Sequence, residues 1–170
     1  GHLDYYADFM FPGMELDNDQ EYRVKPMNCP FHILVYKSRA RSYRDLPVRL
    51  SELGAVYRYE KSGVVHGLLR ARGFTQDVSH TFCTGDQLGA ELALHLDFVL
   101  TWLRDAGFTE FEADLSTQPE KAPSGEQDRW DFAEKALARA LEGSGVSFRI
   151  APGEGAFYGP KIDMHVRDAI

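Results

Sequence analysis

The segment of residues 53–82, LGAVYRYEKSGVVHGLLRARGFTQDVSHTF, places charged side chains within a pattern that otherwise favours β-structure. Two strand-like runs, residues 54–60 and 70–76, flank a loop with glycine and histidine. This pattern predicts a β-hairpin whose arginines converge on one anion, because guanidinium groups bind phosphate through paired hydrogen bonds. The alternative is an exposed hairpin with surface ion pairs, which stabilise a fold very little. The charged residues are Arg58, Glu60, Arg70 and Arg72.

Charge is distributed unevenly along the chain. The formal net charge of −7 argues against a general nucleic-acid binder. Basic residues nevertheless outnumber acidic ones from Lys37 to Arg72, whereas acidic residues predominate from Thr84 to Gly155. We therefore expect a local site for an anionic ligand on an otherwise acidic chain.

Length and composition indicate one soluble domain, or part of one. The chain has 170 residues, 44% of them hydrophobic, and no apolar run long enough to cross a membrane. No signal peptide is recognised at its start, and two cysteines, Cys29 and Cys83, cannot build a disulfide framework. We expect a cytoplasmic protein without membrane attachment.

Two amphipathic helices are predicted after the hairpin. The first opens at Thr84 with a capping box and ends at Gly107, and the second opens at Ser124 and ends before Gly143. Their apolar stripes indicate core packing. The stripe residues are Leu88, Leu92, Leu96, Val99 and Leu103 in the first helix and Trp130, Ala133, Leu137 and Leu141 in the second.

The remaining elements complete an α+β pattern. A helix is expected over residues 30–39, with proline in its first turn. Strands mostly joined as hairpins, without a regular βαβ rhythm, predict an antiparallel sheet flanked by helices. The further strand candidates are residues 21–25, 79–83, 111–115, 146–150 and 161–166.

Four other segments, with the hairpin, carry a family resemblance. They are GHLDYYADFMFP at residues 1–12, KPMNCPFH at 25–32, LSTQPEK at 115–121 and GEGAFYGPKID at 153–163. With these motifs in this order, the chain resembles the threonyl-tRNA synthetases, which are class II aminoacyl-tRNA synthetases, over its whole length. The resemblance implies that residues 1–170 are a partial class II catalytic domain, with motif 2 at about 53–82 and motifs 1 and 3 outside the segment.

The resemblance implies an activity and roles in ATP binding. Family members use ATP with magnesium to activate L-threonine as an adenylate, and then transfer threonine to the 3′ end of tRNA. Arg58 is similar to the motif 2 arginine that contacts the α-phosphate and the amino-acid carboxylate, with Glu60 on the adenine side. Arg70 is similar to the arginine directed at the distal phosphates, and Phe74 to the aromatic residue that stacks on adenine.

A zinc site is implied in the same way. Cys29 and His80 match two of the three family ligands, and the third is expected outside this chain. By spacing alone, Cys29 and His32 form a C-x-x-H pair that is also typical of a zinc half-site. Without the motif context, Cys29 is interpreted as a small buried hydrophobe.

Further residues match the substrate pocket of the family. Gln76, Tyr158 and Lys161 match positions lining the threonine and adenylate site, and His2 matches a histidine near the terminal ribose of tRNA. Taken singly, these are interpreted as surface, loop or terminal residues. One departure stands out, because Val78 replaces the aspartate that accepts a hydrogen bond from the threonine hydroxyl in the family pattern QDDAH.

Three hypotheses remain open from the sequence. The first is part of a working threonine ligase, a homodimer at full length and inactive as this segment alone. The second is a catalytically impaired paralogue that acts as a regulatory or binding module. The third is an unrelated zinc protein, which would need its ligands from the spare histidines His32, His66 and His165.

Overall fold

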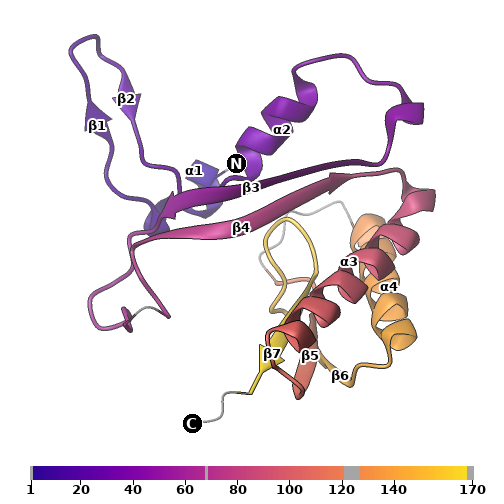
Figure 1. The fold of residues 1–170 in the computed structure, drawn as a ribbon. Helices are drawn as coiled ribbons and strands as arrows, with labels where there is room; N and C mark the ends of the chain where they lie inside the picture. The colour runs from indigo at the N-terminus through magenta and orange to yellow at the C-terminus, as the bar shows by residue number, and fades with distance from the viewer. Residues whose placement is uncertain (1, 68, 121–126, 168–170) are drawn as a thin grey trace. The chain divides into compact units, whose positions relative to one another are not determined.

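The computed structural model describes residues 2–67, 69–120 and 127–167 (Figure 1). The chain divides into two compact units, Gly1–Phe82 and Cys83–Ile170, which are described separately below. Within the described residues, no helix has the length and apolar character that a membrane span requires.

The first unit is built around one long hairpin. Strands β3 (Val48–Tyr57) and β4 (Gly73–Phe82) pair antiparallel in an unbroken register, with Val48 opposite Phe82 and Tyr57 opposite Gly73. The shorter elements before the hairpin are α1 (His2–Tyr5), η1 (Ala7–Phe9), β1 (Met14–Glu15), β2 (Glu21–Tyr22), α2 (Cys29–Lys37) and η2 (Tyr43–Asp45).

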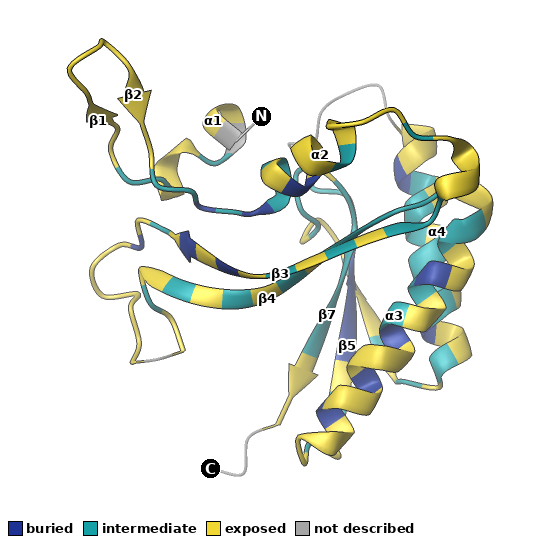
Figure 2. Cartoon of the chain, turned by 45° about the horizontal axis from the view of Figure 1, so that its top comes forward, coloured by how far each residue is buried: buried dark blue, intermediate teal, exposed yellow. Residues whose placement is uncertain are grey.

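The two faces of the hairpin differ in burial. Even-numbered residues of both strands are buried or half-buried, whereas most odd-numbered residues are exposed (Figure 2). This period of two is the signature of a strand that covers other groups on one side only. We call the covered side the inner face, and its central residues are Glu52, Gly54, Val56, Phe74, Gln76, Val78 and His80.

The second unit packs two helices on a three-stranded sheet. Its elements are α3 (Gly85–Asp105), β5 (Phe111–Ser116), α4 (Gln127–Ser144), β6 (Phe148–Ala151) and β7 (Lys161–Val166), and the strand order is β6-β5-β7. The core joins both helices to the central strand β5. Its buried members are Leu96, Leu100, Ala113, Leu115 and Leu141.

The α+β class with antiparallel strand pairs is confirmed, with one addition. Strand β5 pairs antiparallel with β7 but parallel with β6. Parallel neighbours need a long crossover, and α4 supplies it between β5 and β6 (Figure 1). This one parallel pair does not make a regular βαβ rhythm, which the sequence also does not predict.

Several predicted element ends also need correction. The hairpin strands are longer than predicted and lie further apart in sequence, because residues 58–72 belong to the connecting loop. Val99 is exposed and Leu100 takes its place in the core. Helix α4 runs on to Ser144, and Gly145, with φ +73°, follows it instead of Gly143. The predicted start at Ser124 lies outside the described residues.

The capping box of α3 is confirmed. The Gln87 side chain accepts a hydrogen bond of 3.0 Å from the backbone N–H of Thr84, and the Thr84 side chain caps the third helical residue in return. Such reciprocal bonds satisfy two backbone donors that would otherwise lack partners at the helix start. Strand β7 begins and ends where the sequence predicts it.

Candidate functional site

The base of the hairpin loop holds a cavity lined by all four of the residues predicted to bind ATP. Its volume is about 370 Å³, and Arg58, Glu60, Arg70 and Phe74 contribute to its wall. Residues 58 and 60 follow β3, residue 70 precedes β4 and residue 74 lies in β4. The hairpin therefore brings together side chains up to sixteen positions apart, as the sequence predicts. The other lining residues are Leu69, Ala71 and Thr75.

The two arginines of this cavity are held differently. Nε of Arg58 donates to the backbone oxygen of Pro26 at 3.3 Å, and its guanidinium lies 5.3 Å from the centre of the Phe74 ring. Arg70 donates from Nη2 to the Glu60 carboxylate at 3.1 Å, and Glu60 itself is buried. A cation beside an aromatic face, next to a second arginine, suits an anion attached to a flat ring.

Arg72 does not line this cavity, although the sequence pattern groups it with Arg58 and Arg70. Its Nε donates to the backbone oxygen of Glu60 at 3.0 Å, and its guanidinium lies 5.4 Å from the Tyr59 ring centre. Arg72 thus ties the two sides of the loop together, which is a structural role. The backbone bond of 2.8 Å from Arg58 N–H to the Arg72 oxygen has the same effect.

A second group of polar side chains surrounds His80 on the inner face. Nδ1 of His80 lies 2.6 Å from Nδ1 of His32, and the two rings meet edge to face. Nε2 of His32 lies 3.2 Å from the Glu52 carboxylate. Cys29 opens α2 one turn before His32, so that the two residues share one helix face.

Burial controls the protonation of the two predicted metal ligands. It raises the pKa of the Cys29 thiol, against the effects of a backbone hydrogen bond and of the positive charge of Arg58. It lowers the pKa of His80, and the charge of His32 acts in the same direction while Glu52 opposes it. His80 is therefore favoured in the neutral form, which is the form that binds metal.

The described residues fit part of a zinc site. A thiol and an imidazole suit zinc, but the described part of the chain contains no group of three or more ligand side chains able to hold a metal ion. Next to Cys29, both polar side-chain atoms of Asn28 are buried without a hydrogen-bond partner. Buried polar atoms usually have partners, so this orphaned amide is consistent with a group that this chain does not supply.

Gln76 and Val78 lie on the same inner face, four and two residues before His80 respectively. Both are half-buried, and their cross-strand partners are Gly54 and Glu52 respectively. Glu52 therefore brings a carboxylate to the face on which Val78 offers only methyl groups. Sequence reasoning missed Glu52, although the alternation of Leu50, Glu52 and Gly54 could have placed it on this face.

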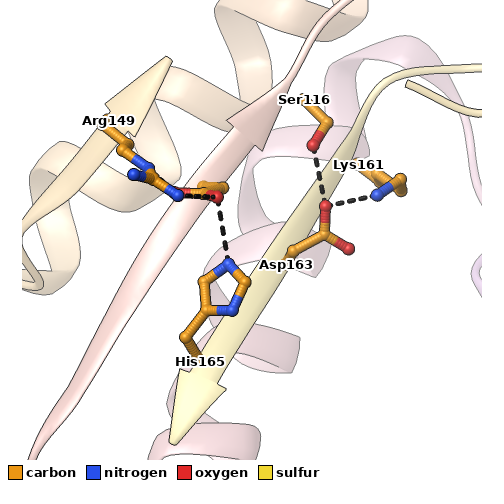
Figure 3. Close-up of polar contacts among 6 residues, drawn as sticks. Ser116, Arg149, Lys161, Asp163 and His165 are labelled. Carbon is orange, nitrogen blue, oxygen red and sulfur yellow. Dashed lines mark hydrogen bonds and ion pairs between the residues drawn. The ribbon is translucent and has the colours of Figure 1, made fainter. Parts of the chain in front are cut away.

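Lys161 and Tyr158 belong to the second unit. Lys161, the first residue of β7, contacts the carboxylate of Asp163, and the Ser116 hydroxyl donates to the same oxygen at 2.7 Å (Figure 3). Burial works to raise the pKa of Asp163, but these hydrogen bonds outweigh it and the pKa is lowered. Tyr158 is exposed in the preceding loop, where its ring meets that of Phe157 edge to face.

A neighbouring ion cluster lies on the same face of this sheet. Asp114 accepts two hydrogen bonds from Arg149, at 2.6 and 2.9 Å, and lies 3.0 Å from Nε2 of His165 (Figure 3). These bonds from Arg149 are the main reason why the pKa of Asp114 falls to about 2. His165, a spare histidine in the sequence, is thus engaged by a carboxylate.

Two other sequence candidates remain to be placed. His2 is the first residue of α1, and its side chain lies outside the described part of the structure. His66 is in the hairpin loop, where its backbone pairs with that of Arg70. Among the described residues, the predicted site side chains therefore gather in three places: the cavity at the hairpin loop, the inner face around His80, and the start of β7 around Lys161.

Sequence comparison identifies a family for nearly the whole chain. The model of the tRNA synthetase class II core domain (G, H, P, S and T) matches residues 13–170. The threonine–tRNA ligase of Aquifex aeolicus (strain VF5) is 55% identical over all 170 residues, which cover 26% of that protein. The ligase of Synechococcus sp. (strain CC9605) is 54% identical, with 28% of its length covered. The chain thus spans about a quarter of the length of these curated relatives.

Solved structures agree with the sequence comparison. The RNA binding domain of threonyl-tRNA synthetase from Cryptosporidium parvum Iowa II superposes with a TM-score of 0.86 at 43% identity, over 99% of this chain and 41% of that one. A putative threonyl-tRNA synthetase, ThrRS-1, from Aeropyrum pernix gives a TM-score of 0.85 at 34% identity, over 98% and 39% of the two chains.

Proposed function

Because this chain belongs to the family of class II tRNA synthetase core domains, we propose that it forms part of the catalytic domain of a threonine–tRNA ligase. The observation that carries the proposal is the cavity at the hairpin, lined by Arg58, Glu60, Arg70 and Phe74. On this proposal, residues 1–170 are a partial catalytic domain, with motif 2 at about 53–82 in the first unit.

The cavity suits the activation step. When the threonine carboxylate attacks the α-phosphate of ATP, negative charge builds up there and on the departing pyrophosphate. Arg58 is positioned to neutralise the α-phosphate while its neighbour Phe74 stacks on adenine. Arg70 is directed at the distal phosphates, and the buried Glu60 both orients Arg70 and faces the adenine side. Magnesium accompanies ATP as part of the substrate.

The inner face suits the amino acid. Cys29 and His80 would hold a zinc ion together with a third ligand from outside this chain, and such an ion would bind the amino and hydroxyl groups of threonine. The neutral state of His80 favours this role. Gln76 and Val78 flank the same position on the inner face. By their match to the family, Tyr158 and Lys161 are assigned to threonine and adenylate binding, and His2 to the terminal ribose of tRNA.

The partners follow from this activity. They are ATP, L-threonine and the acceptor end of the cognate tRNA, and the full-length protein is a homodimer. We place it in the cytoplasm, without membrane attachment, where protein synthesis takes place. We expect tRNA contacts to be confined to the segment from Lys37 to Arg72, because basic residues predominate only there and the rest of the chain is acidic.

The decisive experiment is threonine-dependent exchange of pyrophosphate into ATP by the full-length protein. Arg58→Ala should lower kcat/KM for ATP by roughly 10- to 150-fold, because a hydrogen bond to a charged group contributes about 1.5–3 kcal/mol. Lys61→Ala is the matched control, since Lys61 is an exposed cation in the same loop. Equal exchange by both variants would remove Arg58 from the phosphate site.

Val78 supports a second candidate, a catalytically impaired synthetase that acts as a binding module. An apolar side chain at this place leaves the threonine hydroxyl one acceptor short, which costs about 1–3 kcal/mol if the hydroxyl is buried. The same assay separates the two candidates. ATP binding by calorimetry without threonine-dependent exchange would favour the binding module.

A further inference from the structure

His80 approaches His32 through a specific pair of nitrogens. The 2.6 Å separation joins Nδ1 of one ring to Nδ1 of the other, so that Nε2 of His80 takes no part in the contact. His32 is buried, with 7% of its surface exposed, and its other nitrogen faces Glu52 at 3.2 Å. The three side chains thus form a chain of two contacts across α2, β3 and β4.

The chemistry of the three groups determines where the hydrogens lie. An ionised carboxylate cannot donate a hydrogen bond, so the contact of 3.2 Å with Glu52 favours a hydrogen on Nε2 of His32. When His32 is in its neutral form, its ring has one donor and one acceptor, and Nδ1 of His32 is then the acceptor. Nδ1 of His80 must then carry the hydrogen of the short contact, and Nε2 of His80 keeps a free lone pair.

We propose that Glu52 and His32 are positioning residues that hold His80 in the tautomer with hydrogen on Nδ1, so that Nε2 of His80 binds the zinc ion. This inference rests on the zinc site of the proposed function and deepens it. Metal-bound histidines commonly donate their other ring hydrogen to a partner that fixes tautomer and ring orientation. Here that partner is a second imidazole, which is itself oriented by a carboxylate.

The same distance excludes a site in which the Nδ1 atoms of His32 and His80 both bind the zinc ion. Two nitrogens bound to one tetrahedral zinc at 2.0–2.1 Å lie about 3.3 Å apart. The 2.6 Å between the Nδ1 atoms of His32 and His80 is too short for both atoms to be ligands. Cys29 and His32 share a helix face, but the proton of the short contact leaves His32 no free nitrogen for the metal.

Two substitutions of His32 separate positioning from packing. In the full-length protein, His32→Phe keeps a ring of similar size but removes both nitrogens, and should weaken zinc binding about 10- to 100-fold. His32→Gln keeps an acceptor for His80 and a donor for Glu52, and should recover most of the affinity. Zinc affinity is measured by competition with a chromogenic chelator. If Phe is tolerated as well as Gln, His32 only fills space and the proposal fails.

Glu52→Gln tests the contact between Glu52 and His32. The amide can donate to His32 as well as accept, so it no longer selects one tautomer, and zinc affinity should fall about tenfold. Asp77→Asn is the matched control, because Asp77 is an exposed carboxylate on the opposite face of β4. Equal affinities of Glu52→Gln and Asp77→Asn would overturn the role of Glu52.

Two results distinguish the positioning role of His32 and Glu52 from the existence of the zinc site itself. If Cys29→Ser retains zinc as tightly as the unchanged protein, or if the unchanged protein binds none, the proposed zinc site is wrong. The positioning role of His32 and Glu52 is then wrong as well. If Cys29→Ser loses zinc while His32→Phe does not, the proposed zinc site is supported and the positioning role of His32 is wrong. A zinc-bound crystal structure with Nδ1 of His80 as the ligand would also overturn the proposal, whereas Nε2 is expected.

Discussion

The two units of this chain use their buried positions differently. In the first unit the described buried side chains include the polar Asn28, His32 and Glu60, and the apolar ones are Val56 and Pro26. In the second unit a continuous apolar core joins α3, α4 and β5, and the buried polar residues Glu91, Asp114 and Ser116 are not part of it. The candidate ATP and metal residues lie in the first unit, so functional chemistry and apolar packing are largely segregated.

This difference indicates where the stability of the chain comes from. Apolar burial contributes most of the favourable free energy of folding, whereas buried polar groups cost free energy unless they are paired. The second unit should therefore be the more stable one, and the hairpin unit should depend more on bound substrate and metal. Sites that bind ligands are often drawn from the less stable parts of a protein.

The largest expected effect concerns the core of the second unit. Leu141 is fully buried, and Leu141→Ala should lower the opening free energy of that unit by about 2–5 kcal/mol, because it leaves a cavity. Hydrogen exchange read by mass spectrometry gives this value for peptides of each unit. Leu94→Ala is the control, since half of the Leu94 surface is exposed. An equal loss of protection in the first unit would show one cooperative fold and break the comparison.

The second unit was the easier one to predict, for a physical reason. Its signals are local: the capping box at Thr84, the apolar stripes and the alternation over residues 161–166 each lie within one element. The predictions for this unit differ from the structure where the outcome depends on contacts between elements. Val99 and Leu100 are neighbours on one helix, and only the packing partner decides which of them is buried. The parallel pairing of β5 and β6 depends on how α4 crosses the sheet.

The first unit was predicted through its chemistry rather than through its periodicity. Charged residues located the hairpin, and the resemblance supplied Cys29 and His80. The sequence singles out His32 only through its spacing from Cys29, and the predicted site residues do not include Glu52. These two residues meet because α2 lies against the inner face of the hairpin, and no spacing rule within one element can reveal such a contact.

A pair of glycine substitutions sharpens the contrast between the units. A Cβ at Gly54 would clash with the Asn28 side chain, lying only 2.7 Å from its Cγ, and Asn28 is fully buried. Gly54→Ala should therefore destabilise the first unit by about 1–3 kcal/mol. Gly89 lies inside α3 with open space around it, so Gly89→Ala should stabilise the second unit by about 0.5–1 kcal/mol.

Denaturant unfolding and hydrogen exchange measure both glycine effects. The opposite signs follow from the tight contact at Gly54 and the open helix surface at Gly89. If Gly54→Ala is neutral, Asn28 has room to move and the inner face is less closely packed than the structure indicates.

Val78→Asp tests the specificity of the hairpin unit. In the full-length protein, a carboxylate here should accept the threonine hydroxyl and raise the preference for threonine over serine or valine about tenfold, or ~1.4 kcal/mol. Glu52 lies directly opposite and opposes the gain through like-charge repulsion. Pyrophosphate exchange with the three amino acids measures the preference, and Val78→Ala, which adds no acceptor, is the control. An unchanged preference would mean that Val78 does not face the substrate.

The smallest effect is expected from the ion cluster on the sheet of the second unit. Hydrogen bonds from Arg149 lower the pKa of Asp114 to about 2, so the folded chain resists protonation there more than the unfolded chain does. Their contribution is complete above about pH 4 and is lost as the pH falls toward 2, because the unfolded carboxyl takes up its proton first. Arg149 is three-quarters exposed, so salt should screen the pair and keep the effect small.

Asp114→Asn measures this contribution when the free energy of unfolding is followed by urea titration between pH 2 and 5. The substitution should flatten part of the acid-induced loss, whereas Asp97→Asn, an exposed carboxylate on α3, should leave the profile unchanged. The difference should shrink in high salt, because the Leu141 core is insensitive to screening while the ion pair is not. An identical acid profile for Asp114→Asn and the unchanged chain would mean that the second unit owes its acid stability to apolar packing alone, and the contrast with the polar interior of the hairpin unit would then be sharper still.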